Sequence, residues 1–156
     1  MFNLNVVLLE PRMPGNVGTI GRLCFATGTK LHLIKPYGFG EITAKEVKKA
    51  GLDYWKDLKI SQYNNIEDFY KQNPPSSRHF FATTKTKKYY FDIKFQNNDY
   101  LFFGREDAGL PENLLVENKK NCINIPMTNN ARSLNIANAV SVVTYDAIRQ
   151  NINQFL

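Results

Sequence analysis

The chain has 156 residues, a length most simply accounted for by one domain, and we expect a single domain over residues 1–156. A hydrophobic content of 43% and an aromatic content of 13% exclude a disordered chain. The net charge of +6 favours a polyanionic partner only weakly, because many basic proteins bind no nucleic acid.

Neither the cysteines nor the histidines have the spacing of a metal site. Cys24 and Cys122 lie far apart, and buried reduced thiols are expected rather than a disulfide. His32 and His79 lie in strand-like runs, which favours structural roles. The chain shows no signal peptide and no apolar segment long enough to span a bilayer, so we expect a cytoplasmic protein without a membrane or metal partner.

Strand-like and helix-like segments alternate along the chain. The apolar run from Leu4 to Leu9 predicts a buried strand, and Val17, Ile20 and Cys24 then recur at helical spacing up to Gly28. Further strands are predicted at 31–34, 58–60, 79–83, 100–103 and 122–126. Further helices are predicted at 43–51 (opened by a capping box), at 65–71, after Pro111 and at 133–149.

The last predicted helix is apolar over most of its circumference, which indicates burial in a core or in a subunit interface. Ser133 has the position and the hydroxyl of an N-cap. Asn135, Asn138 and Tyr145 share one face by their spacing. Asparagines at the start of a buried helix need polar partners, so we expect another polar group to meet them.

This alternation of apolar strands and helices predicts an α/β fold with a largely parallel sheet and helices on both faces. Ligands bind such sheets beyond the carboxyl ends of the strands. The segments after Leu9, Thr83, Phe103 and Ile125 all follow strand ends and are candidates for a shared site.

Common nucleotide-binding and hydrolase motifs are absent from the sequence, including GxGxxG, GxxxxGK[ST], GxSxG and HExxH. Three separated segments remain: Asn16-Val-Gly-Thr-Ile-Gly-Arg22, Phe103-Gly-Arg-Glu-Asp-Ala-Gly-Leu-Pro111, and Ile125-Pro-Met with Arg132-Ser-Leu-Asn-Ile-Ala-Asn138. In this order they resemble the three motifs of the SPOUT RNA 2′-O-ribose methyltransferases. Each segment alone is a weak signal, but their joint occurrence is specific and covers nearly the whole chain.

The resemblance is closest to the minimal branch that methylates the wobble nucleotide of tRNA, because no separate RNA-binding domain is present and Ala50-Gly-Leu-Asp-Tyr54 is similar to that branch. It implies a C-terminal trefoil knot, a homodimer, S-adenosylmethionine as methyl donor and the anticodon stem-loop of tRNA as partner. The cofactor residues implied by the motifs are Ala82, Thr83, Gly104, Ile125, Ser133 and Leu134. For Ile125 and Leu134, core packing is an alternative role.

Catalytic roles are implied for Arg22, Asn16 and Tyr145. A guanidinium is essentially never neutral in a protein, so Arg22 is a difficult base. We expect it to bind a tRNA phosphate or the developing alkoxide, with a part in deprotonation left open. Tyr145 is either a substrate-handling residue or a half-buried aromatic.

The predicted substrate-binding residues are Glu106, Arg132, Asn135, Lys85 and Lys88. Glu106 is expected to order its own loop or to hold Arg22, or else to lie in a solvated turn. Residues 84–90 form a basic, aromatic loop whose lysines can bind phosphates and whose Tyr89 and Tyr90 can stack on bases, although a merely exposed loop is nearly as plausible.

These inferences converge on an S-adenosylmethionine-dependent tRNA 2′-O-methyltransferase that acts on the wobble ribose. The alternatives are an enzyme for another tRNA ribose or ribosomal RNA, a noncatalytic RNA-binding protein on the same fold, and a basic domain that binds a small acidic ligand.

Overall fold

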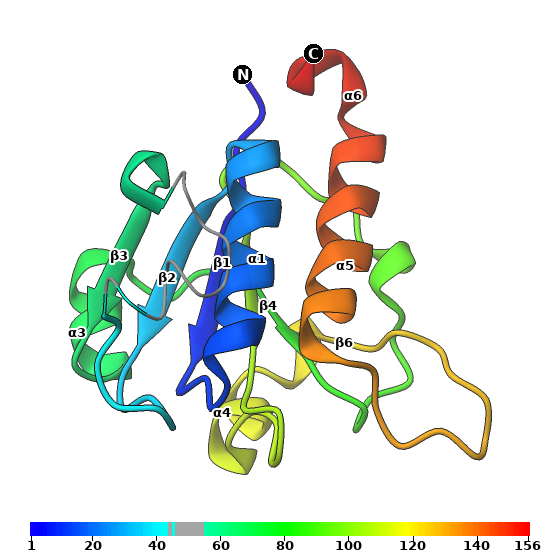
Figure 1. Cartoon of the computed structure of the whole chain (residues 1–156). Helices are drawn as coiled ribbons and strands as arrows, with labels where there is room; N and C mark the ends of the chain where they lie inside the picture. The colour runs from blue at the N-terminus through cyan, green and yellow to red at the C-terminus, as the bar shows by residue number, and fades with distance from the viewer. Residues whose placement is uncertain (44, 46–54) are drawn as a thin grey trace.

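A computed structural model of the protein describes residues 1–43, 45 and 55–156 (Figure 1). The helix predicted at 43–51, apart from residues 43 and 45, and the whole segment at 50–54 lie outside the described residues.

A six-stranded sheet forms the centre of the fold. Its strands are β1 (Asn5–Leu9), β2 (Lys30–Ile34), β3 (Ile60–Tyr63), β4 (His79–Ala82), β5 (Tyr100–Phe103) and β6 (Cys122–Ile123). The spatial order is β3-β2-β1-β5-β4-β6, and every neighbouring pair is parallel. The predicted α/β class with a parallel sheet is therefore confirmed.

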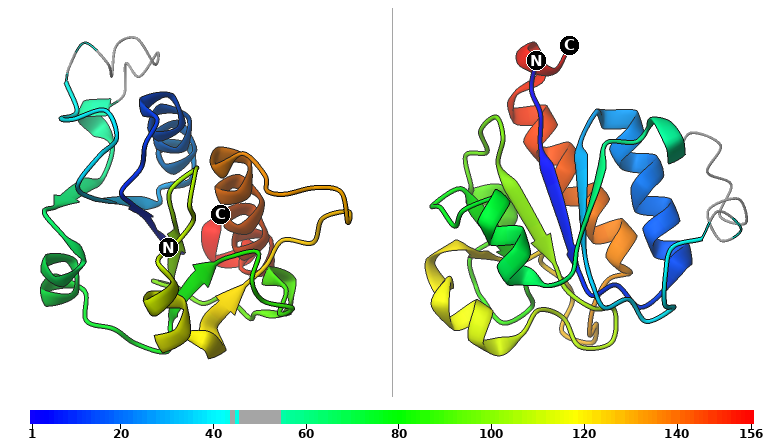
Figure 2. Two further views of the ribbon diagram at one scale, coloured as in Figure 1. Left: turned by 90° about the horizontal axis from the view of Figure 1, so that it is seen from below. Right: turned by 90° about the vertical axis from the view of Figure 1, so that its left-hand side faces the viewer.

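Helices cover both faces of this sheet (Figure 2). One face carries α1 (Pro14–Thr27) and α5 (Ile136–Gln150), which pack side by side, and the other carries α3 (Ile66–Gln72) and α4 (Glu112–Glu117). Strand β1 is buried along its whole length because Val6 and Leu8 face the first helix pair while Val7 and Leu9 face the second. The remaining short helices are η1 (Trp55–Asp57), η2 (Tyr90–Asp92), η3 (Lys119–Asn121) and α6 (Ile152–Phe155).

The strand predicted at 58–60 begins only at Ile60, where pairing with Leu31 starts. Leu58 is instead buried against α1. A Cβ atom at Gly21 would lie 3.3 Å from both Leu58 and Trp55, so Gly21 permits this close approach.

The prediction that Ser133 caps the last helix is wrong. The side chain of Asn135 accepts hydrogen bonds from the backbone amides of Ala137 and Asn138, at 2.9 and 3.3 Å, and the helix begins at Ile136. Asparagine and serine are about equally good N-caps, so the sequence alone did not distinguish the two positions.

Both histidines are buried on the face of the sheet covered by α3. The Nδ1 atom of His32 lies 2.9 Å from the Tyr63 hydroxyl, and Nε2 lies 2.9 Å from Oδ1 of Asn5. Burial lowers the pKa of His32 to about 3 and the pKa of His79 to about 4. The Nδ1 atom of His79 has no hydrogen-bond partner among the described residues, although its ring packs 4.5 Å from that of Tyr100.

The two cysteines are free and buried, as expected. Within the described part of the chain, no group of three or more histidine, cysteine, aspartate or glutamate side chains could hold a metal ion. No helix among the described residues is long and apolar enough to cross a membrane.

We expect the protein to lose stability on mild acidification, because these are its only two histidines and both are neutral when folded. An unfolded histidine takes up a proton below pH 6.5, so the free energy of unfolding should fall by about 1–2 kcal/mol per histidine between pH 7 and pH 5. His79→Phe should fold and should halve this loss, because it removes one of the two titrating groups. Urea unfolding at several pH values measures how steeply the free energy of unfolding falls with pH in each protein. An equally steep fall in wild type and variant would contradict the conclusion that His79 is neutral in the folded protein.

Candidate functional site

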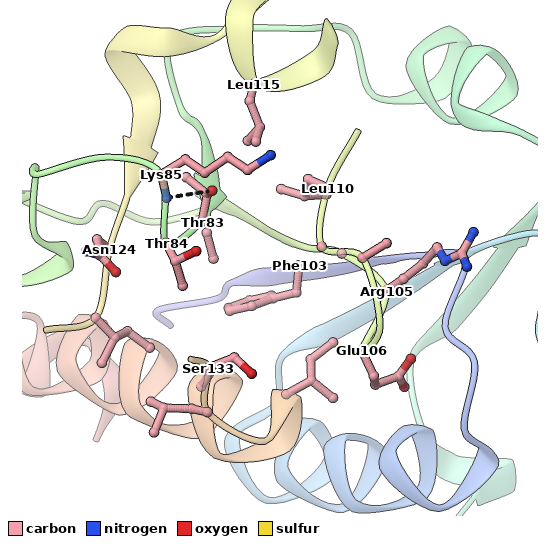
Figure 3. A pocket seen from close by; sticks show the side chains of 18 of the residues that line it. Thr83, Thr84, Lys85, Phe103, Arg105, Glu106, Leu110, Leu115, Asn124 and Ser133 are labelled. Carbon is pink, nitrogen blue, oxygen red and sulfur yellow. Dashed lines mark hydrogen bonds between the residues drawn. The ribbon is translucent and has the colours of Figure 1, made fainter. Parts of the chain in front are cut away.

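A cavity of about 290 Å³ lies at the carboxyl ends of β4, β5 and β6 (Figure 3). Its walls come from residues 82–85, 103–110, 123–125 and 133–134, together with Leu115, Met127, Ile136 and Ala139. The expectation that the segments after Thr83, Phe103 and Ile125 share one site is thereby confirmed. The segment after Leu9 does not line the cavity and reaches it only through Glu106.

All six predicted cofactor residues line this cavity: Ala82, Thr83, Gly104, Ile125, Ser133 and Leu134. Thr83 and Ser133 lie on opposite walls in Figure 3, with Phe103 between them and Leu110 to one side. The cavity therefore combines hydroxyl groups with apolar walls, the usual lining of a small-molecule site. The cofactor role of the six residues stays a prediction.

The loop that follows β5 folds back tightly on itself. The amide of Arg105 donates to the carbonyl of Gly109 at 3.2 Å, and the amide of Gly109 donates to the carbonyl of Arg105 at 2.8 Å. A Cβ atom at Gly104 would overlap the backbone of Gly109 and Leu110. Glycine at 104 is therefore required for this side of the cavity to form.

Glu106 connects this loop to the segment that precedes α1. Its carboxylate accepts the backbone amide of Arg12 at 2.8 Å, the amide of Met13 at 3.3 Å and Nδ2 of Asn16 at 3.3 Å. Of the roles considered for Glu106, the structure supports the ordering of the motif loop. Glu106 forms no hydrogen bond or ion pair with Arg22.

Asn16 continues the connection to the last helix. Its Oδ1 accepts a hydrogen bond from Nδ2 of Asn135 at 3.2 Å, and Asn135 in turn caps α5. The expected polar partner of Asn135 is therefore Asn16. The side chain of Asn138 remains exposed.

Several predicted site residues lie outside the cavity of their own chain: Arg22, Tyr145, Arg132, Asn135, Asn16 and Lys88. Arg22 is exposed on α1 and forms no hydrogen bond or ion pair with the described residues. Tyr145 is 50% exposed, and the rise of an α-helix places it about 9 Å along α5 from the lining residue Ala139. The structure thus separates the predicted catalytic groups from the predicted cofactor residues.

Among the predicted substrate residues, Glu106 and Lys85 line the cavity. Arg105 and Asp107 also lie at its rim and are paired at 2.7 Å, and this hydrogen bond holds the pKa of Asp107 below its usual range. Asn124 and Met127 line it as well, although sequence reasoning assigned them no role. Asn124 lies within the strand predicted at 122–126, and Met127 ends the Ile125-Pro-Met segment of the third motif.

Comparison with known proteins agrees with this arrangement. The model of the SpoU rRNA Methylase family matches residues 3–145. The chain belongs to this family. The membership predicted from the three motifs is confirmed, and the residues that carry those motifs surround or adjoin the cavity.

The relatives include the tRNA (cytidine(34)-2′-O)-methyltransferase of Escherichia coli strain K12, which is 42% identical over 151 residues, covering 94% of this chain and 93% of that protein. A solved structure described as "Structural insights into the 2-OH methylation of C/U34 on tRNA" has a TM-score of 0.90 at 36% identity and covers 97% of this chain and 98% of that one. The AdoMet-bound rRNA methyltransferase from Sinorhizobium meliloti has a TM-score of 0.81 at 28% identity and covers 94% of this chain and 56% of that one.

Glu106→Ala should separate the motif segments, because two backbone amides and Asn16 lose their common acceptor. We expect a loss of about 1–3 kcal/mol in the free energy of unfolding, measured by urea denaturation. Asp107→Ala is the matched control, because it removes the neighbouring carboxylate and only an exposed pair with Arg105. Equal losses in the two variants would show that Glu106 has no special structural role.

Proposed function

We propose that the protein transfers a methyl group from S-adenosylmethionine to the ribose 2′-hydroxyl of the wobble nucleotide of tRNA. The observation that carries this proposal is the convergence of the three motif segments on one cavity and on the hydrogen bonds beside it. The E. coli relative named for cytidine 34 of tRNA, at 42% identity over nearly the whole chain, supports the choice of substrate.

The cavity has features that suit an adenosine-containing cofactor. Gly104 lacks the side chain that would fill the turn behind β5, while Leu110, Ile125 and Leu134 offer apolar walls. When bound, the cofactor would supply an electrophilic methyl group on a sulfonium. The Sinorhizobium relative, which is described as AdoMet-bound, supports this assignment.

Methyl transfer requires an in-line approach of the ribose oxygen, so positioning should supply much of the rate. Arg22 is exposed on α1, has no ion pair with the described residues, and can bind a phosphate through two parallel hydrogen bonds. Because its guanidinium keeps its charge, its role is to hold the RNA or to stabilise the forming alkoxide. Asn16 has both ends of its amide engaged, by Glu106 and Asn135, which fits a positioning role.

A second copy of the chain is part of this proposal. The exposed apolar side chains of α1 and α5, Phe25, Val142 and Tyr145, belong to two helices that pack side by side, and such a face favours a homodimer. A dimer could also bring Arg22 and Tyr145 of one chain to the cavity of the other. The same proposal includes the single domain, the C-terminal knot and the cytoplasmic location expected from the sequence. The one continuous sheet supports the single domain.

The first test is a methyl-transfer assay on total tRNA from cells that lack this gene, with the product mapped by nuclease digestion and mass spectrometry. We expect a 2′-O-methyl mark at the wobble nucleotide, reduced about 10²-fold or more by Arg22→Ala, because the attacking oxygen loses its electrostatic partner. Cofactor affinity, measured by calorimetry, should be unchanged in the variant. A 2′-O-methyl group on another ribose would mean that the enzyme acts on that nucleotide and not on the wobble nucleotide. If neither tRNA nor ribosomal RNA is methylated, a noncatalytic RNA-binding protein is favoured.

The second test asks whether the two chains share one site. Arg22→Ala and Gly104→Ala should each be inactive alone, the latter because the turn that forms one side of its cavity cannot close. If Arg22 acts on the partner's cavity, co-expression of the two variants should restore about a quarter of wild-type activity, because half of the dimers are mixed and each contains one intact site. If Arg22 acts within its own chain, the mixed dimers should stay inactive.

A further inference from the structure

The segment 83–91, which runs from the end of β4 into η2, is fixed beside the cavity by hydrogen bonds to Asn124. The amide of Asn124 donates to the carbonyl of Lys88 at 2.8 Å, and the amide of Tyr90 donates to the carbonyl of Asn124 at 3.0 Å. Nδ2 of Asn124 also donates to the carbonyl of Thr86 at 3.0 Å. Asn124 itself lines the cavity. The loop bonded to it therefore has a defined position beside the proposed methyl-transfer site.

This attachment sorts the aromatic side chains of the loop into two groups. Tyr90 packs against the core beneath α1 and α5, and its ring also meets that of Phe91 edge to face, with centroids 5.2 Å apart. Tyr89 and Phe91 stack on each other, with ring centroids 5.2 Å apart and an interplanar angle of 23°. Phe91 is 48% exposed, so the stacked pair presents an aromatic face to solvent.

Positive charge surrounds this stacked pair. Residues 84–94 contain four lysines and one aspartate, at positions 85, 87, 88, 94 and 92. The Nζ atom of Lys88 donates to the carbonyl of Lys120 at 3.0 Å, which brings the loop next to the exposed lysines of η3. An exposed aromatic pair among lysines has the chemistry of a single-stranded RNA site, in which bases stack on rings and cations bind the backbone.

We propose that Tyr89 and Phe91 form a stacking platform for an unpaired base of the anticodon loop next to the methylated nucleotide. The inference rests on the proposed function and names the surface through which that substrate is held. Lys87, exposed and without a hydrogen bond or ion pair to the described residues, binds a phosphate of the same loop. The platform fixes the RNA and takes no part in the chemical step.

The test measures binding of an anticodon stem-loop RNA that carries 2-aminopurine at one unpaired position at a time. Phe91→Ala should bind about tenfold more weakly and should abolish the fluorescence quenching seen at one position, because stacking on the ring is lost. Phe91→Trp should restore both, whereas Phe91→Leu, which is apolar but not aromatic, should restore neither. Val116→Ala is the matched control, because Val116 is an exposed apolar residue on α4.

A second experiment tests the contribution of Lys87 to RNA binding. Lys87→Gln should weaken binding and should reduce the slope of the logarithm of the binding constant against the logarithm of salt concentration by about 0.7. Phe91→Ala should leave that slope unchanged, because a ring releases no counterion.

The outcomes separate the two proposals. If the wild type methylates the wobble ribose but Phe91→Ala binds RNA like the Val116→Ala control, the platform is wrong and the proposed function stands. If the wild type methylates no RNA, the proposed function fails, and quenching that depends on residue 91 still decides whether the platform binds bases. A loss of dimerisation in Phe91→Ala, seen by sedimentation, would assign the pair to a contact between copies and overturn the platform.

Discussion

The carboxylate of Glu106 is the contact on which the arrangement of the site depends. It holds two amides of the segment before α1 together with the side chain of Asn16, and Asn16 holds the residue that caps α5. Three stretches far apart in sequence are thereby joined by a few polar contacts. Charge-assisted hydrogen bonds such as these are stronger than neutral ones, so a single carboxylate can fix the starts of two helices.

The predicted cofactor residues and the predicted catalytic residues lie in two different regions of the chain. The carboxyl ends of β4, β5 and β6 form a cavity in which small and apolar residues stand beside Lys85 and the loop that carries Glu106 and Asp107. Both carboxylates are already engaged, Asp107 by Arg105 and Glu106 by the segment before α1. The charged and phenolic groups of Arg22 and Tyr145 lie on the exposed sides of α1 and α5. A reaction that needs positioning more than proton transfer can tolerate such a division, provided that the RNA or a second chain brings the two regions together.

The sequence predicted the sheet and the cavity well, because both follow from regular patterns. Alternating apolar runs indicated a parallel sheet, and such a sheet gathers its strand ends at one edge. The start of α5 was misplaced because Ser133 and Asn135 are both good caps and only the hydrogen bond to Asn16 distinguishes them. The partner of Glu106 was left open for a similar reason, since it lies some 90 residues away in the chain.

In the aromatic loop, too, the sequence could not choose between neighbouring residues. Tyr89 and Tyr90 are chemically alike, and composition alone offered both as stacking residues. The backbone pairing with Asn124 decides between them, because it turns Tyr90 toward the core and leaves Phe91 at the surface beside Tyr89. Asn124, directly after β6, thus lines the cavity and also fixes the loop that carries the aromatic pair. The distance between a stacked base and the reacting ribose would then be set by the end of β6 and the segment hydrogen-bonded to it.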